Sequence, residues 1–389
     1  MAGVKVKLTP QILDWVRTKM LLENNVDTYV LERLKMWKTG EKIPTFHQIQ
    51  EVSRKTHIPF GYFLLEVPPE EECEILKYRT VDRRGVREPS RNLRDVIDMM
   101  TDIQEWMAEY QENSGQEPVH FVGCDQKEKD PDIIAGHIRE DLKLKKEWME
   151  NCSQASEAFG LIRSQLEEKG ILVMMSGIVG NQTRRKLNIE EFRAFALIDP
   201  YAPLIFINGC DSENGKLFSI LHETAHIWMG NNSFYNEAPW YEEGIKEPEV
   251  ICNAVTAEIL TPEEIFLKKW QEYRTNTTDK AEILSKYFNC SQFVIIRRAS
   301  DLGLISAEKY HKLTETMKQQ YQRWRDDRKR EKNAGGNYYS TMKSRMDRRF
   351  ILALDQSTRE GRTQYTEAFR MTGTNRTTFE RLVEEITGG

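Results

Sequence analysis

The sequence lacks several features that define whole classes of protein. Its six cysteines are scattered and none lies in a CxxC pair, which excludes a cysteine-based zinc site and a dithiol redox motif. Scattered single cysteines are typical of a reducing compartment. No apolar run approaches the roughly 20 residues of a membrane span, and the first residues carry no apolar segment of a signal peptide. We therefore expect a cytoplasmic protein with no membrane partner.

A strong charge of one sign is also lacking. The net charge is -5, which argues neither for nor against a nucleic-acid partner. Hydrophobic residues make up 39% of the chain, enough to form a sizeable core, while 30% of residues are charged and indicate a hydrated surface. A length of 389 residues accommodates two to four domains.

The pattern along the chain predicts an α+β protein that is mostly helical. Residues 8–66 contain three amphipathic helical patterns with tight turns, the outline of a helix-turn-helix module or of a plain helical bundle. Three β-rich runs follow later: ILVMMSG, FRAFALID and PLIFING. We predict five parts: a helix-turn-helix-like domain (1–66), a helical connector (67–153), an α+β domain (154–262), a second helix-turn-helix-like subdomain (263–310) and a basic helical region (311–389).

Two of these parts have alternative interpretations. Residues 263–310 contain two helical patterns joined at Asn289–Ser291, with Arg297 and Arg298 on the second. They form either a helix-turn-helix or a hairpin that supports the preceding domain. In the tail, basic residues alternate with aromatic ones, which suits phosphate binding or a solvated face. The aromatic residues are Trp324, Tyr338, Tyr339 and Phe350.

The segment FSILHETAHIWMG (218–230) holds two of the seven histidines. His222 and His226 lie four residues apart, so on a helix they share a face and can both reach one zinc ion. Glu223 points to another side, where it can act as the general base on a water molecule, as in HExxH sites. Ser212 and Gly230 mark the ends of this helix, which we predict to be amphipathic and to face a cleft.

A catalytic zinc site needs a third protein ligand. The acidic candidates downstream are Glu237, Glu242, Glu243, Glu247, Glu249 and Glu258. Pro248 suits the first turn of a helix and Pro262 the position after its end, which favours Glu249 at the start of that helix. Asn253, one turn further on, is placed to orient a ligand. The competing interpretation is a chance HExxH in a helical scaffold without metal.

The β-rich run PLIFING precedes the histidine helix by a few residues. We predict that it is an edge strand, on which an extended peptide can pair next to the metal. Tyr235 and Tyr241 lie in the right region to stabilise an oxyanion, although the sequence does not single out either.

These segments resemble a known family. LHETAHIWMG followed by EVICNAVTAEILTP is similar to the ImmA/IrrE family of intracellular zinc metallopeptidases. The resemblance implies a zincin-like metallopeptidase domain at 154–262 with a gluzincin-type site: Zn²⁺ held by His222, His226 and Glu249, with Glu223 catalytic. Cys252 and Val255 replace an alanine and a phenylalanine of the family pattern, and both changes affect packing rather than chemistry.

The resemblance covers most of the chain. LTPQILDWVRTKM and MWKTGEKIPTFHQIQEVSRKTHIPFGYFLL are similar to the XRE-type helix-turn-helix region fused to some members. It implies a protein substrate, such as a helix-turn-helix repressor, and a possible toxin or antitoxin partner. The alternative is a DNA-binding transcription regulator, or an antitoxin-like protein, with a structural or idle zinc site. Only a short segment separates the first helix from DTYVLERLKMW, so residues 8–66 either bind DNA or dock a protein partner.

Overall fold

A computed structural model describes residues 4–22, 27–70, 89–235, 247–330 and 338–388. The chain divides into two compact units, of which the first contains the N-terminal helices and extends to Val96, and the second contains everything from Ile97 onwards. No helix in these ranges is both long enough and apolar enough to cross a membrane.

The N-terminal unit contains the three predicted helices. They are α1 (Pro10–Leu22), α2 (Thr28–Lys38) and α3 (Phe46–Thr56), followed by the 3-10 helix η1 (Phe60–Leu64). Thr9 accepts a hydrogen bond from the Ile12 amide at the start of α1, and Thr45 and Gln48 form a capping box on α3. Apolar residues of all four elements form a separate core within this unit.

The second unit is built on a small mixed sheet. Its strands lie in the order β1 (Leu172–Ser176), β5 (Leu204–Asn208), β4 (Ala194–Leu197) and β6 (Ser233–Tyr235). β1 runs parallel to β5, whereas β4 is antiparallel to both β5 and β6. The three predicted β-rich runs correspond to β1, β4 and β5. The sequence analysis missed the short strand β6 and the hairpin of β2 (Ile178–Val179) and β3 (Gln182–Lys186).

The prediction that PLIFING is an edge strand is wrong. This run is β5, which lies between β1 and β4 and is buried along its whole length. A continuous apolar run suits a central strand, because both faces and both edges of such a strand are covered. The edges of the four-stranded sheet are β1 and β6.

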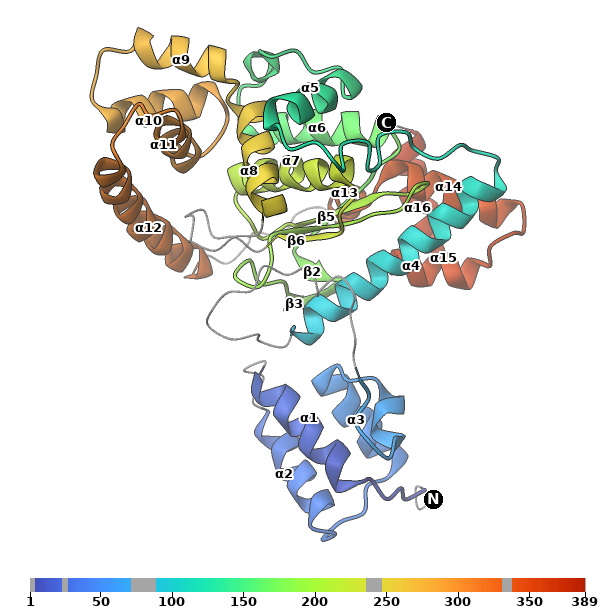
Figure 1. Cartoon of the computed structure of the whole chain (residues 1–389). Coiled ribbons are helices and arrows are strands. Elements are labelled where there is room, and N and C mark those ends of the chain that lie inside the picture. The colour runs from blue at the N-terminus through green and yellow to red at the C-terminus, as the bar shows by residue number, and fades with distance from the viewer. Residues whose placement is uncertain (1–3, 23–26, 71–88, 236–246, 331–337, 389) are drawn as a thin grey trace. The chain divides into compact units, whose positions relative to one another are not determined.

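Helices cover one face of this sheet, as Figure 1 shows. α6 (Ala155–Glu168) and α7 (Glu213–Met229) lie directly on the sheet, and α5 (Pro131–Asp141) and α8 (Glu247–Leu260) pack on α7. α7 packs on β4 and β5 and is flanked by α6 and α8. The long predicted helix near residues 91–112 is α4 (Arg91–Asn113). The structure is therefore mostly helical with a small sheet at its centre, as the sequence predicts.

The helices after α8 share the core of the sheet domain. They are α9 (Glu263–Glu272), α10 (Thr277–Tyr287), α11 (Gln292–Asp301) and the long α12 (Ala307–Arg330). Leu284 and Ile295 lie in one apolar cluster with residues of α7 and α8. Arg298 forms an ion pair with buried Glu258 of α8, and Arg297 pairs with Asp301. α10 and α11 therefore pack on the sheet domain, and the choice between a helix-turn-helix and a supporting hairpin stays a prediction.

The C-terminal region contains α13 (Tyr338–Arg345), α14 (Arg348–Arg359), α15 (Tyr365–Thr372) and α16 (Arg376–Thr387). Phe350 is fully buried. Its ring packs edge-on against Trp106 of α4. Phe350 therefore does not belong to an exposed aromatic and basic stripe. The break predicted after α12 falls largely on residues 331–337, outside the described residues.

The connector that precedes α5 supports the end of α7. The amides of Gly123 and Asp125 donate to the carbonyls of Ile227 and Trp228 at 3.0 and 2.9 Å, so they satisfy acceptors that a helix end leaves open. The Phe121 ring stacks on Trp228 with centroids 4.2 Å apart. Gly230 follows with φ 69°, and a Cβ at that position would lie 2.9 Å from the Cα of Gly123.

Replacing Gly230 with alanine is therefore expected to lower the free energy of unfolding by about 2–5 kcal/mol. The left-handed backbone accounts for about 1–2 kcal/mol and the overlap with Gly123 for about 1–3 kcal/mol. Gly303→Ala is the matched control, because Gly303 has φ 67° and nothing within 4 Å of the added Cβ. Denaturant unfolding followed by circular dichroism measures both. Equal losses in the two variants would show that the contact with Gly123 contributes nothing.

Candidate metal centre

The histidine helix α7 begins and ends where the sequence predicts. Ser212 caps its N-terminus by accepting from the Gly215 amide at 3.1 Å, and Gly230 ends it in the left-handed conformation. The predicted amphipathic character is wrong, because every residue from Ser219 to Met229 is buried. Other helices enclose the sides that the sheet leaves open. The histidines consequently lie in the interior, where polar side chains need partners.

Three predicted ligands come together in this interior. His222 Nε2 lies 3.1 Å from Glu249 Oε2 and 3.1 Å from His226 Nε2, and His226 Nε2 lies 3.5 Å from the same carboxylate oxygen. Ligand atoms about 2.0–2.1 Å from one tetrahedral zinc ion would lie about 3.3–3.4 Å apart. The observed separations therefore fit a single zinc ion. Among the described residues, this is the one group of histidine, cysteine and acidic side chains close enough to hold a metal ion.

The start of α8 places the third of these side chains. Pro248 lies in its first turn, as predicted, and Glu249 is 5% exposed, whereas Glu247 faces solvent and contacts Lys129. Glu258 lies at the other end of α8, where Arg139 and Arg298 pair with it. Three further acidic candidates, Glu237, Glu242 and Glu243, lie outside the described residues, as does Tyr241.

The pKa shifts of Glu249, His222 and His226 favour a positive charge between these three side chains. Burial alone would raise the pKa of Glu249, but hydrogen bonds from His222 and His226 outweigh it and lower that pKa. Burial lowers the pKa of His222, which keeps it in the neutral form that binds metal. Burial also opposes a charge on His226, yet Cys252 and Glu249 raise its pKa well above the usual range.

Glu223 is fully buried close to His226 and Glu249, and it also contacts the first residue of β6. The hydroxyl of Ser233 donates a hydrogen bond to its Oε2, while its Oε1 has no hydrogen-bond partner among the described residues. Burial raises the pKa of Glu223 to about 7, a value suited to a group that both accepts and donates a proton. Ser233 was not among the residues expected at the site, because no sequence pattern connects this serine to the helix.

Two neighbouring residues of α8 lie close to the histidines. Asn253, predicted to orient a ligand, hydrogen-bonds to His222. Cys252 raises the pKa of His226, and its sulfur lies 3.4 Å from the Met229 sulfur. From the sequence we assigned Cys252 to packing alone.

Comparison with known families identifies the central region. Residues 166–300, which include all of these side chains, match the family described as the IrrE N-terminal-like domain of the M78 peptidases. The chain contains an M78 metallopeptidase domain. Its buried His222, His226 and Glu249 fit a gluzincin zinc site. This match agrees with the resemblance seen in the sequence of this region.

The rest of the chain is matched less. Residues 346–385 match a domain of unknown function (DUF8813). Neither match includes residues 8–66, so the XRE-type resemblance of this region stays a prediction. Comparisons with curated proteins and with solved structures give no significant match.

Proposed function

We propose that the chain is a zinc-dependent endopeptidase that cleaves a regulatory protein, with a helix-turn-helix repressor as the first candidate. The observation that supports it is the joint burial of the three ligand side chains beside Glu223 inside the M78 domain. A purely structural zinc site uses all four coordination positions, whereas three protein ligands leave one open for chemistry.

Each residue of the site then has a distinct role. His222, His226 and Glu249 would hold the zinc ion, which supplies the Lewis acidity that activates a water molecule and a peptide carbonyl. Glu223 accepts the proton of the attacking water and passes it to the leaving amine. The hydroxyl of Ser233 holds one carboxylate oxygen of Glu223, so the other oxygen remains available for the proton.

The edge strand β6 is the best place for the substrate to bind. Its first residue, Ser233, contacts Glu223, and within the described ranges β6 pairs with β4 and with no other strand. An extended peptide that adds to the outer edge of β6 would therefore pass close to the site. This role replaces the one predicted for β5.

The alternative function, DNA binding by the N-terminal unit, has less support from its surface charges. Lys55 of α3 forms an ion pair with Asp27 at 3.0 Å and lies 4.3 Å from the ring centroid of Tyr29. Arg33 of α2 lies over the same ring and near Glu51. These cations have partners within the unit, and α1 and α2 are separated by residues 23–27 alone. We favour a unit that docks the protein substrate.

Purified protein is expected to carry about one zinc ion per chain and to cleave a co-expressed candidate repressor at a defined bond. A chelator should abolish cleavage, and added zinc should restore it. Elemental analysis, mass spectrometry of the fragments and a gel shift on the upstream DNA measure these properties. Sequence-selective DNA binding that weakens steeply with salt, without cleavage of any candidate, would support the DNA-binding alternative instead.

A further inference from the structure

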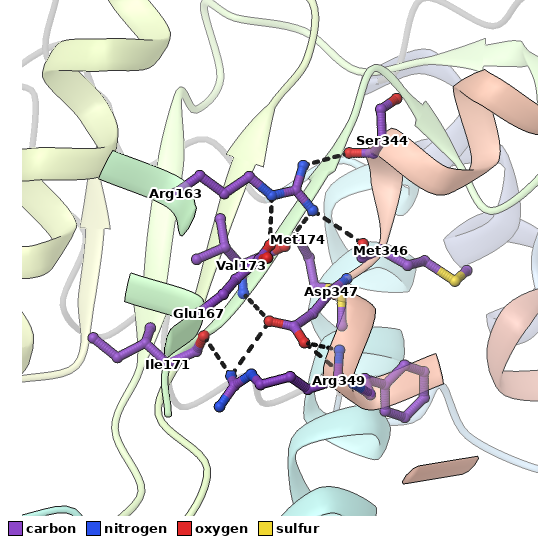
Figure 2. Close-up of polar contacts among 10 residues, drawn as sticks. Arg163, Glu167, Ile171, Val173, Met174, Ser344, Met346, Asp347 and Arg349 are labelled. Carbon is purple, nitrogen blue, oxygen red and sulfur yellow. Dashed lines mark hydrogen bonds and ion pairs between the residues drawn. The ribbon is translucent and has the colours of Figure 1, made fainter. Parts of the chain in front are cut away.

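The outer edge of β1 is covered by side chains instead of by another strand. In its parallel pairing with β5, the Leu172 amide donates to the Pro203 carbonyl, so the backbone groups of Ile171 and Val173 point to the other side. Figure 2 shows these outward groups, the carbonyls of Ile171 and Val173 and the amide of Val173, each bonded to a charged side chain.

Asp347 covers the amide on this edge and also begins a helix of the C-terminal region. Its Oδ2 accepts from the Val173 amide at 3.3 Å and from Arg349 at 3.4 Å. Its Oδ1 accepts from the amides of Arg349 and Phe350, which caps the N-terminus of α14. The side chain is fully buried. Oδ1 therefore caps α14, and Oδ2 binds the edge of β1.

Two arginines cover the carbonyls. Arg349, two residues after Asp347, donates to the Ile171 carbonyl at 2.7 Å. Arg163 of α6 donates to the Val173 carbonyl at 3.1 Å and to the carbonyls of Ser344 and Met346 at 2.6 and 3.0 Å. Glu167 pairs with Arg163 at 2.6 Å. Arg163 therefore connects β1 to the last turn of α13 and to Met346, which follows that helix.

We propose that the C-terminal region matched by the domain of unknown function acts as an edge cap, which prevents a second copy of the chain from pairing with β1. An edge strand with open amides and carbonyls is a template for another strand, and charged side chains are one means of blocking it. Asp347 and Arg349 belong to this matched region. They occupy the Val173 amide and the Ile171 carbonyl, two of the groups that an added strand would use.

The two oxygens of Asp347 allow a sharp test in the full chain. Asp347→Asn keeps an oxygen for the α14 cap but presents an amide NH₂ to the Val173 amide and to Arg349, which are both donors. Asp355→Asn is the matched control, because Asp355 lies on the same helix and pairs with Arg359, away from β1. A second variant, Arg349→Ala, removes the bond to the Ile171 carbonyl and keeps the Asp347 carboxylate.

We expect the Val173 amide to exchange its hydrogen about 10–100-fold faster in Asp347→Asn than in Asp355→Asn. The amides of α14 should remain protected in both. Light scattering should show that Asp347→Asn and Arg349→Ala self-associate at concentrations at least about tenfold lower than Asp355→Asn does. Unchanged exchange at Val173 would overturn the proposal. So would self-association equal to that of the control in both edge variants.

Discussion

Replacing Glu223 with glutamine is expected to reduce peptide cleavage by about 100–10,000-fold while zinc stays bound. The loss follows because an amide cannot accept the proton of the attacking water. The metal ligands are other side chains, so zinc content should not change. Glutamine has nearly the same size and can still accept the hydrogen bond from Ser233, so the buried site should keep its shape. Cleavage assays and elemental analysis of the same preparation measure both quantities.

The control for this variant is Glu213→Gln, which removes the same charge from the first turn of α7. Glu213 is half exposed and pairs with Lys216, so its replacement should leave cleavage within about twofold. Full cleavage by Glu223→Gln would exclude Glu223 as the base. Loss of zinc from that variant would show that Glu223 has a direct part in holding the metal.

Replacing Glu249 with alanine is expected to weaken zinc binding by more than about 100-fold, because changes behind a ligand already cost about 10–100-fold and this change removes a ligand itself. The weaker binding should also reduce the stabilisation of the folded protein by zinc. A ligand at 100 times its Kd stabilises the folded protein by about 2.7 kcal/mol. The wild-type chain should therefore gain thermal stability on zinc addition, and the Glu249→Ala chain should gain little.

Glu247→Ala is the matched control on the same helix, since Glu247 is exposed and pairs only with Lys129 in the described part of the chain. It should bind zinc as the wild type does. If Glu249→Ala also kept wild-type affinity, the third ligand would be another acid. Glu237, Glu242 and Glu243, which lie outside the described residues, would then be the next to replace.

The elements that carry the site can be predicted from the sequence, because helix periodicity and helix ends depend on residues that are close together in the chain. A spacing of four residues puts His222 and His226 on one face of any α-helix, and Ser212 and Gly230 determine the ends of that helix. Pro248 and Pro262 likewise placed the start and end of α8 within a residue or two, which singled out Glu249. The three β-rich runs were found for the same reason.

Contacts between segments that are far apart in the chain could not be predicted from these local patterns. Periodicity shows that a strand exists but not its neighbours, so β5 was assigned to an edge although it lies between β1 and β4. The polar residues of α7, among them His222, Glu223 and His226, suggest a helix with one exposed face. They are nevertheless buried, because other helices cover the sides that the sheet leaves open. The short strand β6, which brings Ser233 to Glu223, is set by pairing with β4.

The sequence by itself determined which residues form the His-His-Glu group, because the pattern of a helix is local. The tertiary structure decided what surrounds them: Ser233 on the Glu223 carboxylate, Cys252 and Asn253 close to the histidines, and the connector at the end of α7. It also decided that Asp347 and Arg349 cover β1, more than 170 residues away in sequence. These contacts depend on how separate elements pack, a choice that only the whole fold makes.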